Sequence, residues 1–135
     1  MVRSHLLLFM NRELFSAVEE CDLDKVKHLI DKGVDINATD EDGNTVLILA
    51  SAPYDNIIEE ELPYLELLQL LLSAPNIKLN IENNEGLTAL DVAYEYEMSD
   101  CIELLEKAGA ERGISYLVEI YVESSREERK YNGSI

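Results

Sequence analysis

One phrase occurs twice in this chain: DEDGNTVLILA at residues 40–50 and NNEGLTALDVA at residues 83–93. Both copies keep the same Gly, Thr, Leu and Ala at the same spacing. Gly43 and Gly86 predict tight turns with positive φ. The Thr two residues later is a favoured N-cap, and the Leu and Ala that follow share one helix face. A short helix is therefore predicted after a tight turn in each copy.

A second phrase, rich in leucine, precedes each copy and returns once more near the end of the series. Residues 29–37, 71–80 and 104–110 each begin with two adjacent apolar residues. These residues fit the apolar face of a further helix, and Gly33 and Gly109 are placed to end two of those helices. Each unit is then a pair of helices that cannot bury its apolar face alone. Stacking of the units is predicted to build the core.

In the order and spacing of these phrases, the chain resembles the ankyrin repeat family over roughly residues 11–111. The resemblance implies an all-α fold, an ankyrin repeat solenoid of about three helix-turn-helix repeats with a C-terminal capping segment. The first repeat lacks the turn phrase and is expected to begin directly in a helix at residues 13–20. The expected organisation is a stack over residues 1–111, with repeats at about 11–39, 40–82 and 83–111, and a partly frayed capping segment at 112–135.

The chain departs from the family pattern in two places. Ile48 and Asp91 stand where the family usually has His, so its Thr–His hydrogen bond is absent from both copies. The two turn glycines lie 43 residues apart, against a family period of about 33. About ten extra residues fall within residues 53–64, which are predicted to form an inserted loop between the two helices of the middle repeat.

The segment 114–123 fits either secondary structure from its pattern alone. A helix that caps the open end of the stack is the favoured prediction, and a strand is the alternative. The helical spacing is that of Ile114, Leu117, Val118 and Tyr121, and the strand alternation is that of Tyr116, Val118, Ile120 and Val122.

The charge of the chain limits its possible partners. The formal net charge is -17, and residues 40–106 hold 16 acidic residues and a single base, Lys78. Binding to nucleic acid or to an anionic membrane surface needs clustered Lys and Arg, so neither partner is expected.

The apolar run Leu6–Met10 is too short for a signal peptide or a membrane span. A cytoplasmic, monomeric protein with reduced cysteines is expected.

Known catalytic and metal-binding motifs are missing from the sequence. It has no phosphate-binding glycine loop, no nucleophile elbow and no H-E-x-x-H. His5 and His28 have no obvious metal-ligand partners, and a surface or packing role is favoured for His28. The acidic runs 40–42 and 59–61 lack the spacing of a calcium loop. The prediction is a chain that is not an enzyme and that needs no cofactor and no metal.

The family resemblance implies that partners dock on the concave face made by turn tips and first helices. Of twelve positions carried over to that face, six are acidic and none is basic. A face of one sign would steer a cationic partner. Four tyrosines, a residue common at recognition surfaces, surround the acidic region: Tyr54, Tyr64, Tyr94 and Tyr96. The candidate partner-binding residues are Glu19, Glu20, Glu41, Asp42, Asn44, Tyr54, Glu59, Glu60, Glu61, Asn84, Glu85, Leu87, Glu95 and Tyr96.

The leading hypothesis is a non-enzymatic protein-binding module whose acidic concave face binds a basic protein. A narrower form is an inhibitor or immunity protein of a toxin, because short ankyrin-like proteins of bacteria can act in that way and nuclease toxins are basic. Two alternatives stay open. One is a general adaptor or regulatory interaction module whose acidic surface serves solubility, and the other is a repeat unit that self-associates through the ends of its stack.

Overall fold

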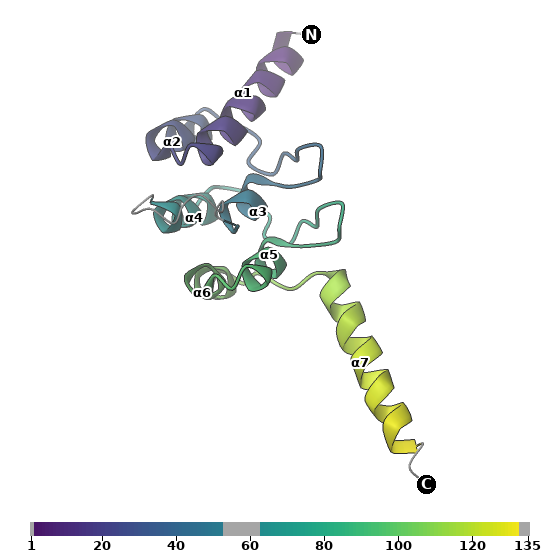
Figure 1. Cartoon of the computed structure of the whole chain (residues 1–135). Coiled ribbons are helices and arrows are strands. Elements are labelled where there is room, and N and C mark those ends of the chain that lie inside the picture. Colours follow the sequence, from purple (N-terminus) through teal and green to yellow (C-terminus); the bar gives the residue numbers. More distant parts are fainter. Residues whose placement is uncertain (1, 53–62, 133–135) are drawn as a thin grey trace.

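The computed structural model describes residues 2–52 and 63–132, and over these ranges the chain forms helices and no strands (Figure 1). The all-α prediction is therefore confirmed. The helices are α1 (Val2–Glu19), α2 (Leu23–Asp31), α3 (Val46–Ala50), α4 (Tyr64–Leu72), α5 (Ala89–Glu95), α6 (Ser99–Ala108) and α7 (Ile114–Asn132).

The first six helices stack as three pairs, α1 with α2, α3 with α4, and α5 with α6. Figure 1 shows α2, α4 and α6 along one side of the stack and the extended turns between the pairs along the other. The core lies between the two layers of helices, because each layer turns an apolar stripe inward. Its fully buried leucines include Leu14, Leu47, Leu68, Leu71 and Leu105.

The turns between the pairs form as the repeated phrase predicts. Gly43 and Gly86 have φ values of 79° and 76°. Thr45 and Thr88 are N-caps, and each side chain accepts a hydrogen bond from the third residue of its helix. A Cβ on Gly43 would lie 2.6 Å from Oδ1 and 2.9 Å from the backbone N of Asn84. Glycine is thus required there both by its φ and by the closeness of the next turn.

Asn84 joins the tips of the two turns. Its backbone N–H donates to the Asp42 carbonyl at 3.0 Å, and its Nδ2 donates to the Glu41 carbonyl at 3.1 Å. These bonds give the second tip a fixed position relative to the first.

Two other asparagines, which recur at the end of the leucine-rich phrase, connect successive repeats. Asn37 Nδ2 donates to the Asn76 carbonyl at 2.8 Å, and Asn37 Oδ1 accepts from the Lys78 N–H at 2.8 Å. Asn80 Oδ1 accepts in the same way from the Glu111 N–H at 2.8 Å. The backbone groups that these asparagines bind lie outside any helix. The recurring Asn therefore supplies them with hydrogen bonds that regular secondary structure does not provide.

The first helix is longer than the sequence analysis predicts. α1 begins at Val2, whereas the prediction began a helix at residue 13. Residues 2–12 contain no Gly and no Pro, so nothing in them stops the helix. The apolar run Leu6–Met10 is therefore part of α1, and Leu6, Leu7, Leu8 and Phe9 are exposed.

The segment after the last repeat is a helix, so the strand alternative for residues 114–123 is wrong. α7 is bound to the stack through its first turn: the Ile114 N–H donates to Glu82 at 2.8 Å, and the Ser115 hydroxyl donates to the Glu85 carbonyl at 3.1 Å. Beyond that turn α7 projects away from α5 and α6 (Figure 1). The short connection Glu111–Gly113 is bound to Thr88 and Asp91 at the start of α5. It does not bring the body of α7 over the end of the stack, so α7 does not cover that end as the expected cap would.

Candidate partner-binding surface

A central groove of about 280 Å³ lies between the two turn tips and helices α3 and α5. The exposed carboxylates of Glu85 and Glu95 line it, next to Tyr96, which is 55% exposed. The groove thus combines negative charge, an aromatic ring and apolar side chains. Its lining residues are Asn44, Ile48, Leu49, Ala52, Asn83, Glu85, Leu87, Val92, Glu95 and Tyr96.

A wider groove of about 680 Å³ lies between α1 and the first turn tip. Glu19, Glu41 and Asp42, three of the candidate partner-binding residues, line it. Arg12 lines it as well, on the turn of α1 that the sequence analysis left outside the helix. A basic residue therefore lies at this end of the surface, where no basic residue was expected.

A third groove of about 350 Å³ separates α5 from α7. It shares Leu87 and Glu95 with the central groove, so the two are continuous. Arg112 and Glu119 line its far side. All three grooves thus carry carboxylates, and two of them also carry an arginine, Arg12 beside α1 and Arg112 beside α7.

The structure brings together most of the predicted partner-binding residues, but not all of them. Glu20 is exposed and lines none of these three grooves, and Asn84 lies between the tips with its side chain bound to Glu41. Asn44, Glu85, Leu87, Glu95 and Tyr96 line the central groove, and Glu19, Glu41 and Asp42 line the groove beside α1. Tyr54, Glu59, Glu60 and Glu61 lie outside the described residues.

A family model described as ankyrin repeats, in 3 copies, matches residues 14–115. The chain belongs to the ankyrin repeat family. Rabankyrin-5 of Mus musculus is 30% identical to it over 82 residues, which are 61% of this chain. The same residues are 6% of the mouse protein, so the chain spans only a small part of that relative's length. Ankyrin repeats are modules for protein–protein interaction, which fits a surface of open grooves.

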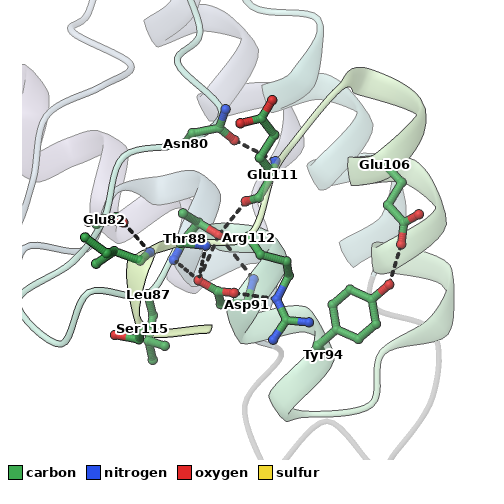
Figure 2. Close-up of polar contacts among 12 residues, drawn as sticks. Asn80, Glu82, Leu87, Thr88, Asp91, Tyr94, Glu106, Glu111, Arg112 and Ser115 are labelled. Atoms are coloured by element: carbon green, nitrogen blue, oxygen red, sulfur yellow. Dashed lines mark hydrogen bonds and ion pairs between the residues drawn. The ribbon is translucent and has the colours of Figure 1, made fainter. Parts of the chain in front are cut away.

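Asp91, at the position where ankyrin repeats usually carry His, is a buried acid with a full set of partners (Figure 2). Its Oδ2 accepts from the Thr88 N–H at 2.9 Å and from the Gly113 N–H at 2.8 Å, and its Oδ1 accepts from Arg112 Nε. Burial alone would raise the pKa of Asp91, but the hydrogen bonds from Thr88, Arg112 and Gly113 outweigh it and lower the pKa. The carboxylate therefore stays ionised and ties the end of the ankyrin stack to the start of α7.

Arg112, the partner of Asp91, lies between two aromatic rings. Its guanidinium carbon is 4.4 Å from the ring centroid of Tyr94 and 3.6 Å from that of Tyr116, distances typical of cation–π contacts. The Tyr94 hydroxyl donates to Glu106 at 2.6 Å, and this hydrogen bond raises the pKa of Tyr94. Tyr94, considered above as a contact residue, is thus held by contacts within the chain.

The pairing of Asp91 with Arg112 was not predicted from the sequence. One signal was available: Asp91 sits on the apolar face of a helix, where an unpaired charge would be costly. Arg112 follows the last repeat directly, although only the fold shows that it reaches back to α5. Tyr64 is also not a free contact residue, because it is half-buried against the core.

The described part of the chain contains no cluster of three or more side chains able to hold a metal ion. None of its helices is both long and apolar enough to cross a lipid bilayer. Both cysteines are free thiols, and burial raises the pKa of Cys101 to about 11. Cys101 is therefore protonated near neutral pH, which makes it a poor nucleophile.

Proposed function

We propose that this ankyrin repeat protein binds a basic protein through the central groove and the adjoining first turn tip, and that it catalyses no reaction. The observation that carries the proposal is the lining of the central groove. Glu85, Glu95 and Tyr96 share it with apolar side chains, and its described lining includes no basic residue. A lysine or arginine of the partner would find two carboxylates and a tyrosine ring in one place.

The charges that line the three grooves favour contact through the central groove rather than through the whole concave surface. Arg12 lines the groove beside α1 together with Asp42, and Arg112 in the groove beside α7 is paired with Asp91. The central groove carries Glu85 and Glu95 and no described base. Charge complementarity then asks for a partner that is basic at its centre. The field of the central acids would also speed the encounter with such a partner.

The narrower form of the proposal is an inhibitor, in which a basic toxin such as a nuclease is the partner, acting in the cytoplasm. The competing function is a general adaptor whose acidic residues serve solubility alone. The large net charge of residues 40–106 is compatible with both functions. Changing charges inside the proposed contact area, and separately outside it, distinguishes them.

Reversing three acids of the contact area tests the proposal. The variant Asp42→Lys, Glu85→Lys, Glu95→Lys is expected to slow association with the native partner by roughly tenfold or more at low salt, because the attraction that steers the encounter is removed. Its rate should also depend less on salt, since exposed charges are screened over about 8 Å at physiological ionic strength. The measurement is capture from native lysate, followed by association kinetics of the captured protein with both chains.

A matched control changes the charge by the same amount away from the grooves. Asp31, Glu66 and Glu103 are exposed on α2, α4 and α6, one on each outer helix. Their reversal to Lys should leave the association rate close to that of the unchanged protein. Equal slowing by both triple variants would mean that overall charge is what matters, and the adaptor hypothesis would then be preferred.

The inserted loop gives an independent prediction. Deletion of residues 56–61 should leave the stack folded, because loop length adds little to the free energy of chain closure. If Tyr54 is an anchor positioned by this loop, the deletion should speed dissociation of the partner several-fold, with the melting temperature nearly unchanged. An unchanged dissociation rate would remove the loop from the binding surface.

A further inference from the structure

The central groove has the size of a site for one long side chain. Its volume of about 280 Å³ is just below the range of roughly 300–1,000 Å³ that is typical of pockets for drug-sized ligands. Leu49, Ala52 and Leu87 line it and are half-buried, so they offer an apolar surface to whatever enters. A long charged side chain can cover such a surface with its methylene groups and keep its charged end among exposed polar groups.

The exposed groups of this groove are suited to a cation. Glu85 and Glu95 are exposed, and Tyr96 beside them is 55% exposed. All three line the groove, and the residues that the structure describes place no base in it. The groove therefore offers two carboxylates and an aromatic ring that no cation of the described chain occupies.

The wall that carries Glu85 is fixed by its own hydrogen bonds. Asn83 Oδ1 accepts from the N–H of Glu85 at 2.9 Å and from the N–H of Leu87 at 3.0 Å. Asn83 Nδ2 donates to Asn44 Oδ1 on the first turn at 2.9 Å. The main chain of this wall is thus ordered before a ligand enters, which lowers the entropy lost on binding.

The adjoining groove between α5 and α7 holds similar groups with their cation in place (Figure 2). There the guanidinium of Arg112 lies 4.4 Å from the ring centroid of Tyr94 and 3.6 Å from that of Tyr116, and its Nε donates to Asp91. Glu95 follows Asp91 by one turn on the same side of α5. The cation that this chain itself places between tyrosine rings and a carboxylate of α5 is a guanidinium.

We propose that the central groove is a receptor for a single arginine side chain of the partner protein. Glu85 and Glu95 accept hydrogen bonds from the guanidinium, Tyr96 provides a ring for it to stack on, and the methylene groups lie on the apolar surface. This inference rests on the proposed function and names the residue of the partner that occupies the same groove.

The groups of the groove favour arginine over lysine. A guanidinium is planar and weakly hydrated, so it can stack on a tyrosine ring while its separate nitrogens donate to different carboxylates. An ammonium group is a compact charge that holds its water more strongly. Arginine is also among the residues that contribute most to binding at the centre of protein interfaces.

Titration of the isotope-labelled chain with N-acetyl-arginine methylamide, followed by NMR at constant ionic strength, tests the proposal. Binding on the order of millimolar is expected for so small a ligand, with shifts concentrated around the groove. The lysine analogue should bind at least about threefold more weakly, and the uncharged citrulline analogue should not bind measurably. The variants Glu95→Gln and Tyr96→Leu should each weaken binding of the arginine compound at least about threefold.

Two control variants make the same changes outside the grooves. Glu97 and Tyr121 are exposed and line none of the three grooves, so Glu97→Gln and Tyr121→Leu should bind the arginine compound normally. Absence of binding by the unchanged chain, equal binding of the lysine compound, or full binding by both groove variants would each overturn the proposal.

The titration is independent of the association kinetics that test the proposed function. If the arginine compound fails to bind but the triple charge reversal still slows association of the native partner, the arginine receptor is wrong and the proposed function stands. If the compound binds in the groove but the triple reversal leaves the association rate unchanged, the groove is an arginine receptor and the partner docks elsewhere.

Discussion

Asp91→Ala is expected to lower the free energy of unfolding by about 3–5 kcal/mol, the cost of breaking a buried ion pair by removing one partner. The substitution deprives Arg112 of its carboxylate and leaves the N–H groups of Thr88 and Gly113 without their acceptor. Gly113 is buried, so water does not readily replace that bond. Urea unfolding followed by circular dichroism measures the loss. The exposed Glu95 on the same helix is the control, and Glu95→Ala should cost under about 0.5 kcal/mol.

The same site predicts a dependence of stability on pH. The pKa of Asp91 is lower in the folded chain than the value of about 3.9 for an unfolded Asp, so the ionised carboxylate stabilises the fold above that pH. This contribution is lost as the pH falls through the folded-state pKa. The difference in stability between the unchanged chain and Asp91→Asn should therefore be largest at neutral pH and shrink in acid. A difference that stayed constant down to low pH would mean that the charge of Asp91 contributes nothing.

Leu71→Ala is expected to destabilise the chain by about 2–5 kcal/mol, the usual range for a leucine removed from a packed core. Leu71 is 0% exposed on α4, and α4 packs against α2, α3 and α6. The cavity would thus lie in the one helix pair that contacts both neighbours. Unfolding in urea should show a lower midpoint and an unchanged slope.

The control for this prediction is Gln69→Ala, which lies on the same helix but is exposed. It should change the stability by less than about 0.5 kcal/mol, because no packing is lost. If Leu71→Ala unfolded at the same urea concentration as this control, the buried face of α4 would be assigned wrongly.

The fold could be predicted from the sequence because local signals and repetition agreed. Gly43 and Thr45 predict a turn and a helix start, and the same pair of signals recurs at Gly86 and Thr88, which excludes coincidence. The start of α1 could not be placed in this way. Residues 2–12 lack a cap, a breaker and a repeat partner, so their helix depends on propagation from the packed turns that follow.

The candidate site was predictable to the extent that it follows the repeat. Glu85, Leu87, Glu95 and Tyr96 could be carried over position by position, and the structure places them around one groove. Arg12 and Arg112 could not be found in this way, since both lie outside the repeated phrases. Their place on the surface depends on the path of α1 and on the ion pair with Asp91, which are properties of the assembled stack.

The bonds from Asn84 to the backbone of the first turn have a consequence for affinity. Glu85 and Asp42 sit on tips whose main chains are joined, so the separation of their backbones is set before any partner arrives. Such preorganisation saves the loss of conformational entropy that ordering two free loops would cost on binding. Because the tips are held by main-chain and Asn84 contacts, their exposed side chains can change without moving the scaffold. The same rigid pair of tips could therefore present different charges to different partners.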